Sequence, residues 1–246
     1  MNPYYRLLIS NKGLGQFKAK AVENDAATVY LYDSIVSSEI EADYFGGVDP
    51  KQFAQALAGI KASTINLRVN SPGGSVFAAR AMAQAIKDHP AKVIAHVDGL
   101  AASAASFLIM AADEIVMAEG SFIMIHNAWS MTIGNAEGLR QEADLLDTID
   151  ESLVKTYAKR TNVSKDDIRS MMADETWLDA EQAVAQGFAT SIAGESSDPQ
   201  MATKWDLSAY DQEPDAEPVI KDDTEQDQRK RRFDLAKRAL FARRTD

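Results

Sequence analysis

Three short segments hold the residue types that acyl transfer through a covalent serine intermediate requires. Residues 70–74 (NSPGG) form a glycine turn, residues 99–103 (GLAAS) place a serine among small residues, and residues 124–126 (MIH) end in a histidine. This chemistry needs a nucleophile, a base and main-chain donors for the oxyanion. The order of serine before histidine differs from chymotrypsin and from subtilisin. The sequence therefore indicates a serine peptidase on another scaffold.

Ser103 is the candidate nucleophile. Alanines on both sides of Ser103 allow close approach of a substrate, and the amide of Ala104, at the start of a predicted helix, would face a developing oxyanion. The competing interpretation is a packing serine in an alanine-rich helix. Ser106 is the better candidate for that ordinary role.

The Gly73-Gly74 turn follows a predicted strand and precedes a predicted helix. Glycine permits close backbone approach, so the amide of Gly74 would be a second oxyanion donor, in a turn stiffened by Pro72. No Gly-Lys-Ser/Thr follows and the GxGxxG spacing is missing, so neither a P-loop nor a dinucleotide fingerprint is present. The alternative is a tight strand-to-helix turn with Ser75 as N-cap.

The chain has three histidines. His126 ends an apolar run and is the best candidate for the base. His96 lies in a strand pattern just before the serine segment, and His89 precedes a proline at a helix end, so we expect structural roles for both.

Strand-like and helix-like segments alternate between residues 28 and 192, which predicts a mostly parallel sheet covered by helices. The predicted strands are residues 28–32, 64–69, 92–97, 114–117 and 122–125, and the predicted helices are 50–60, 76–88 and 101–111. A long helix is predicted over residues 135–159 because apolar residues recur there every three or four positions. Its apolar stripe fits packing within the protomer or contact between subunits.

Composition limits the classes of function. The 246-residue chain has 46% hydrophobic residues, a net charge of -11 and no cysteine. This excludes a disulfide framework, thiolate metal ligands and a cysteine nucleophile, and it argues against nucleic-acid binding by the main domain. No signal peptide or membrane-spanning run is visible, so we expect a soluble cytoplasmic protein without a membrane partner. We expect neither a cofactor nor a metal ion.

The character of the chain changes near residue 194. We predict a main domain over residues 1–194, an acidic flexible linker over 195–228 and a basic amphipathic tail over 229–246. The tail fits a solvated segment, but also docking on an acidic protein surface or contact with nucleic acid or membrane.

The three motifs, together with residues 177–183 (WLDAEQA), resemble the ClpP peptidases over residues 28–192. The resemblance implies an α/β fold of the ClpP/crotonase type, built from repeated βαβ units, with a long protruding helix and, here, a flexible C-terminal tail. It also implies a homo-oligomeric ring, a heptamer or a double heptamer, in which the helix after the histidine joins the rings.

Carried over by position, the resemblance makes Ser103 the nucleophile, His126 the general base, and the amides of Gly74 and Ala104 the oxyanion hole. The aspartate that completes the family's triad falls at Glu175, a departure from the pattern. Adjacent Asp174 is the alternative. Either acid would hold His126 in its productive tautomer.

Residues 175–177 (ETW) also resemble the phage-encoded branch of the family, which comprises head maturation proteases. We therefore predict an ATP-independent serine endopeptidase that cleaves capsid or scaffold polypeptides in the host cytoplasm or the phage prohead. One alternative is a general ClpP-like proteolytic subunit that works with an unfoldase. Others are a crotonase-fold acyl-CoA hydratase or isomerase, which would leave the Ser103/His126 pair idle, and a noncatalytic assembly scaffold whose tail docks on capsid protein.

Overall fold

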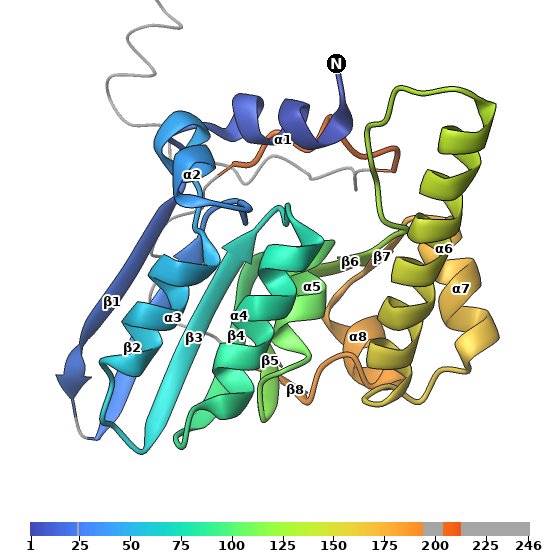
Figure 1. Ribbon diagram of the computed structural model, residues 1–246. Helices are drawn as coiled ribbons and strands as arrows, with labels where there is room; N and C mark the ends of the chain where they lie inside the picture. Colours follow the sequence, from blue (N-terminus) through green and yellow to red (C-terminus); the bar gives the residue numbers. More distant parts are fainter. Residues whose placement is uncertain (24, 194–203, 213–246) are drawn as a thin grey trace, which may run out of the picture. The chain divides into compact units, whose positions relative to one another are not determined.

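The computed structural model describes residues 1–23, 25–193 and 204–212 (Figure 1). The predicted basic tail 229–246 lies outside the described residues, as does most of the predicted linker 195–228. Within the described residues, no helix is both long and apolar enough to cross a membrane.

A mostly parallel sheet forms the centre of the fold, as the alternating pattern predicts. Its strands are β1 (Gln16–Glu23), β2 (Ala26–Tyr32), β3 (Thr64–Ser71), β4 (Lys92–Ala102), β5 (Glu114–Met117), β6 (Phe122–Ile125), β7 (Thr176–Leu178) and β8 (Ser191–Ile192). The main path runs β1-β2-β3-β4-β5-β8, and β6 pairs with both β4 and β7. β1 is antiparallel to β2 and β7 to β6, whereas the other pairs are parallel. The α/β fold class is thus confirmed.

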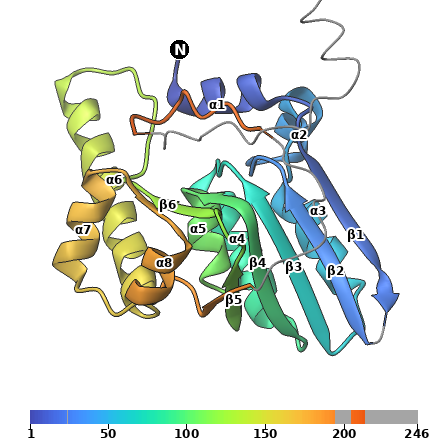
Figure 2. The same cartoon turned by 180° about the vertical axis from the view of Figure 1, so that it is seen from behind.

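Helices cover one face of this sheet. The helices of the described residues are α1 (Pro3–Asn11), α2 (Glu39–Phe45), α3 (Pro50–Ala58), α4 (Val76–Asp88), α5 (Ala104–Ile109), α6 (Ala136–Ala158), α7 (Lys165–Ala173) and α8 (Ala180–Gln186). Of these, Figure 1 shows α3, α4 and α5 on that face, in front of the strands. Figure 2 gives the view from behind, where no described helix covers β1 to β4. The main apolar core fills the space between these helices and the sheet.

The junction of β4 and α5 differs from the prediction. The strand predicted over residues 92–97 continues to Ala102, and the helix predicted from residue 101 begins at Ala104. The reason is tertiary pairing: Leu100, Ala101 and Ala102 pair with β6, and this pairing outweighs the helix preference of alanine. The serine segment therefore sits at the very end of a strand.

α6 matches the predicted long helix, and its two halves have different surroundings. In the second half Ile149, Leu153 and Tyr157 are buried. In the first half the side chains of Leu139 and Leu145 are 46% and 47% exposed. Figure 1 shows this first half extending past α5 and α7. The apolar stripe thus serves intramolecular packing only over its second half.

Residues 204–212, which we call the strap, pack on the domain from within the predicted linker. The strap appears orange-red beside α1 in Figure 1. The Asn11 side chain of α1 links the strap to the domain through two hydrogen bonds. Its amide donates to the main-chain oxygen of Asp206 (2.9 Å), and its Oδ1 accepts from the main-chain N–H of Asp206 (2.7 Å). Composition did not predict this contact, because Trp205 and Tyr210 are isolated aromatic residues in an acidic stretch.

Candidate active site

Ser103 occupies a strained elbow between β4 and α5. Its φ of 53° and ψ of -118° are unusual for a residue other than glycine. The main-chain N–H of Ser103 donates to the main-chain oxygen of Met124 (2.9 Å). The main-chain oxygen of Ser103 accepts from the Ser106 hydroxyl (2.7 Å). Ser106 also hydrogen-bonds the Tyr157 hydroxyl (3.0 Å). Ser106 thus fills the packing role, while the Ser103 side chain faces the site.

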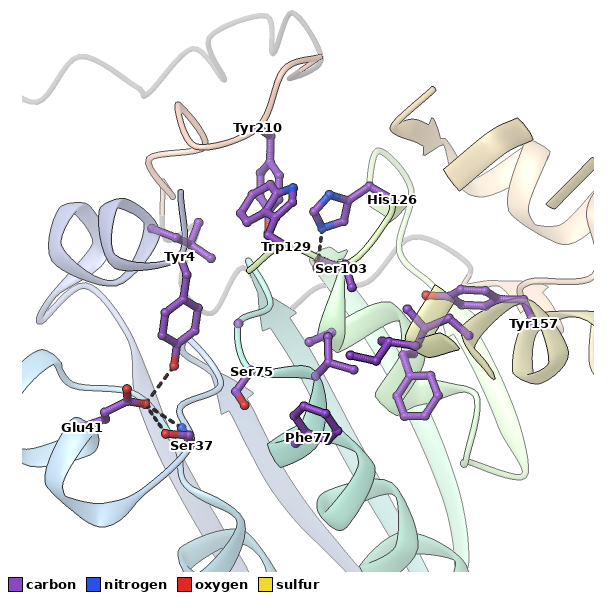
Figure 3. A pocket seen from close by; sticks show the side chains of 18 residues that line it. Tyr4, Ser37, Glu41, Ser75, Phe77, Ser103, His126, Trp129, Tyr157 and Tyr210 are labelled. Atoms are coloured by element: carbon purple, nitrogen blue, oxygen red, sulfur yellow. Dashed lines mark hydrogen bonds between the residues drawn. The ribbon is translucent and has the colours of Figure 1, made fainter. Parts of the chain in front are cut away.

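His126 lies next to this serine. Its Nε2 is 2.7 Å from Ser103 Oγ, the contact drawn in Figure 3. The contact follows from the topology, because Ala102 of β4 pairs with Met124 of β6. Burial lowers the pKa of His126 to about 4, so the imidazole is neutral at pH 7 and Nε2 can accept the serine proton.

The turn before α4 supplies candidate oxyanion donors and requires both of its glycines. Gly73 and Gly74 have φ of 90° and 141°. A Cβ at Gly74 would overlap the main-chain oxygen of Ile35, and one at Gly73 would crowd the Ser103 elbow. Within the described part of the chain, the N–H groups of Gly74 and Ala104 donate no hydrogen bond, so both are available to an oxyanion.

The two candidates for the third catalytic residue lie at the start of β7. Ile125 pairs with Thr176 in antiparallel register, so the next pair along the ladder is His126 and Glu175. Glu175 is buried and has a φ of 49°. Asp174 is exposed at the end of α7. The register thus brings the backbone of Glu175 beside the histidine.

The Glu175 carboxylate, however, is bonded to the strap. It accepts hydrogen bonds from the N–H groups of Asp211 (3.0 Å) and Gln212 (2.7 Å), and from Trp177 Nε1 (3.4 Å). Among the described residues, no hydrogen bond joins His126 to Glu175 or to Asp174. The structure brings together Ser103 and His126 but leaves the third position unengaged.

Two aromatic residues beside His126 were not predicted from the sequence. The Tyr210 ring stands perpendicular to the imidazole, with centroids 5.3 Å apart, and Trp129 lies 4.5 Å from it (Figure 3). The Tyr210 hydroxyl donates to the oxygen of Pro72. Burial raises the pKa of Tyr210, so it stays a neutral donor. Both rings pack against His126, which is buried.

A cavity of about 220 Å³ opens beside Ser103. Its lining includes apolar side chains of α4, α5 and α6, namely Phe77, Phe107, Ile149 and Leu153. Such a cavity suits an apolar side chain of a polypeptide.

The other two histidines have structural partners. His96 Nε2 lies 3.0 Å from Asn66 Oδ1, and His89 Nδ1 accepts from the N–H of Ala91 (3.1 Å). In the described ranges, no group of three or more acidic or histidine side chains is placed to hold a metal ion.

The arrangement agrees with sequence comparison. A model of the Clp protease family matches residues 51–196. The chain belongs to the Clp protease family. Ser103, His126, Gly74, Ala104 and Glu175 all lie inside the matched residues, whereas α1 and the strap lie outside them.

Individual members of the Clp protease family show the extent of the similarity. The chain is 30% identical over 129 residues to an ATP-dependent Clp protease proteolytic subunit of Pleurastrum terricola, covering 52% of this chain and 66% of the relative. It is 28% identical over 130 residues to an ATP-dependent Clp protease proteolytic subunit of Deinococcus radiodurans, covering 52% of this chain and 64% of the relative. The match thus spans slightly less than two thirds of these relatives.

A solved structure shows the same fold. A mutant ClpP1 of Listeria monocytogenes superposes with a TM-score of 0.58 at 21% identity, covering 68% of this chain and 91% of the other. The predicted ClpP-like fold and family are therefore confirmed.

Proposed function

We propose that this member of the Clp protease family is a serine endopeptidase. The observation that carries the proposal is the 2.7 Å contact between Ser103 Oγ and His126 Nε2, at an elbow flanked by the main-chain N–H groups of Gly74 and Ala104, neither of which donates to another described residue. This geometry has the parts of acyl transfer through a covalent serine. In a crotonase-type hydratase, by contrast, the pair of Ser103 and His126 would have no role in the reaction.

In the proposed reaction, Ser103 Oγ attacks the peptide carbonyl while His126 Nε2 takes the hydroxyl proton. The N–H groups of Gly74 and Ala104 bind the oxyanion of the tetrahedral intermediate. His126 then gives its proton to the departing amine, leaving an acyl ester on Ser103. Water, activated by the same imidazole, hydrolyses the ester and restores the serine.

We assign the third position to Glu175. Its backbone lies across from His126 in the β6–β7 ladder, and it is buried, whereas Asp174 is exposed. A carboxylate there would fix the imidazole tautomer and stabilise the imidazolium. To do so, it must exchange its bonds to Asp211 and Gln212 for one to His126.

The proposed substrates are capsid or scaffold polypeptides during phage head maturation, which the resemblance of residues 175–177 to the phage branch supports. The alternative is a proteolytic subunit that depends on an unfoldase, which the names of the relatives favour. Purified protein given unfolded casein without nucleotide separates them. Cleavage supports the ATP-independent reading, and cleavage that requires an unfoldase and ATP supports the alternative.

We further propose a homo-oligomeric ring. The first half of α6 supports this, because Leu139 and Leu145 remain exposed there at a stripe that continues into the core. In a ring, these side chains would be covered by another subunit.

Peptide hydrolysis tests the proposed chemistry. Ser103→Ala should abolish cleavage of a fluorogenic peptide, since no other group replaces the attacking hydroxyl. Ser170→Ala, an exposed serine on α7, is the matched control and should cleave at the wild-type rate. Undiminished cleavage by Ser103→Ala, or hydration of an enoyl-CoA by the wild type, would refute the assignment.

A further inference from the structure

We propose that the strap, residues 204–212, is an intramolecular inhibitor that occupies the substrate's place over the active site, with Tyr210 as the blocking side chain. The proposal rests on the proposed function and concerns the regulation of the same site. The strap lies outside residues 51–196, the range that matches the family model.

Tyr210 sits where a polypeptide must pass to reach Ser103. It lines the cavity beside Ser103, its ring contacts the His126 imidazole, and its hydroxyl bonds the oxygen of Pro72. Pro72 belongs to the same turn as the oxyanion donor Gly74. Only 6% of the surface of Tyr210 is exposed, so its side chain is buried against these groups. A substrate carbonyl at the elbow would have to displace it.

The other end of the strap is anchored by side chains distinct from the catalytic pair. Trp205 is buried, and its Nε1 donates to Asn70 Oδ1 (2.9 Å). Asn11 of α1 makes two hydrogen bonds with the main chain of Asp206. These bonds place the strap between α1 and the turn at residues 70–74.

The strap also withholds the proposed third catalytic group. The N–H groups of Asp211 and Gln212 bind both carboxylate oxygens of Glu175. In the described part of the chain, no hydrogen bond engages Nδ1 of His126. Release of the strap would remove both donors from the carboxylate of Glu175, whose backbone lies across from His126 in the β6–β7 ladder. One movement would open the site and complete it.

The strap can leave without opening the main core. Trp205 and Tyr210 belong to a small apolar cluster with Leu7, Leu100 and Met124, which is separate from the core between the helices and the sheet. Every other strap residue is exposed or half-exposed. Two buried aromatic side chains, the partly buried Leu207 and Ala209, and seven hydrogen bonds hold it, all of them outside the main core. Such a peripheral contact suits local release.

The first test measures how fast a fluorophosphonate labels Ser103 in the full chain. Trp205→Ala/Tyr210→Ala should label about tenfold faster than wild type or more, because apparent reactivity scales with the fraction of molecules whose site is open. Tyr210→Phe, which keeps the ring but loses the hydroxyl that bonds Pro72, should label a few times faster. Lys204→Ala, at an exposed strap position, is the control and should label at the wild-type rate. Thermal melts establish that each variant is folded.

The second test does not depend on catalysis. A fluorescent peptide with the strap sequence (KWDLSAYDQ) should bind Ser103→Ala/Trp205→Ala/Tyr210→Ala, measured by anisotropy. It should not bind Ser103→Ala alone, whose own strap fills the site. The peptide with alanine in place of tyrosine should not bind either protein.

Unchanged or slower labelling of folded Trp205→Ala/Tyr210→Ala and Tyr210→Phe, without peptide binding, would overturn the proposal and make the strap a fixed part of the fold. If the peptide binds as expected but Ser103 is labelled in no variant, the strap's role as an occupant stands and the serine chemistry fails. The two proposals can thus fail separately.

Discussion

His126 combines two properties that set the behaviour of the site at the scale of single residues. It contacts Ser103 Oγ through Nε2, and it is enclosed by the rings of Trp129 and Tyr210. Enclosure disfavours the imidazolium and lowers the pKa of His126 to about 4. A base with this pKa stays ready over a wide pH range but is a weak proton acceptor.

The pH dependence of Ser103 labelling follows from this burial. A protonated imidazole cannot accept the serine proton, so the wild-type rate should be level near neutral pH and fall as pH drops, with a midpoint at about 4. The ordinary histidine midpoint is about 6.5. The measurement is the rate of Ser103 labelling from pH 3.5 to 8. A midpoint near the ordinary histidine value would contradict the prediction and show that the imidazole is hydrated or paired with a carboxylate.

Gly74 provides a second prediction at this scale. Gly74→Ala would drive a Cβ into the Ile35 oxygen and displace the N–H donor. Loss of one oxyanion donor typically lowers kcat by about a hundredfold or more. Gly120→Ala is the matched control, because Gly120 also has positive φ (75°) but open space around its Cβ position. Equal peptide hydrolysis by the two variants would contradict the role of Gly74.

The strap and the β6–β7 pair determine the state of the site at the scale of elements. The register of β6 and β7 sets Glu175 across from His126, but the strap holds the carboxylate. The same strap shields the imidazole. Its release should therefore change the electrostatics of His126 as well as access to Ser103.

In Trp205→Ala/Tyr210→Ala the midpoint of labelling should move upward, toward 6.5 or above. Water and a free Glu175 carboxylate both stabilise the imidazolium and so raise its pKa. Adding Glu175→Gln to this variant should lower both the midpoint and the rate, since the amide carries no charge. Identical profiles for the wild type and Trp205→Ala/Tyr210→Ala would show that the strap does not control the electrostatics of the site.

Local pattern was enough to predict the βαβ elements and the long helix, because their apolar periodicity agrees with the packing they adopt. Prediction from local pattern failed where contacts between residues distant in the sequence determine the structure. β4 continues to Ala102 because β6 pairs with it, and the position of Glu175 depends on β7. The strap was missed because its two buried side chains, Trp205 and Tyr210, follow neither helical nor strand periodicity.

The exposed first half of α6 is the feature of the whole molecule that the proposed ring would use. Residues 131 and 133, in the loop before it, add two more exposed apolar side chains, Met131 and Ile133. Burying a leucine contributes about 1.5–3 kcal/mol, so several such side chains from each subunit would give a stable contact.

Leu139→Lys/Leu145→Lys should therefore weaken assembly. Native mass spectrometry should show a large oligomer for the wild type and smaller species for this variant. Gln141→Lys places a charge at an exposed polar position on the same helix and should leave the number of subunits in the oligomer unchanged. An unaltered oligomer in the leucine variant would exclude this half of α6 as a subunit contact.

The central claim is that Ser103 becomes covalently acylated with His126 as its base. Peptide mass mapping after reaction with a fluorophosphonate tests this most directly. We predict one adduct, on Ser103, whose formation is lost in Ser103→Ala and strongly slowed in His126→Ala. An adduct on another residue, or equal labelling of Ser103 with and without the histidine, would contradict the account.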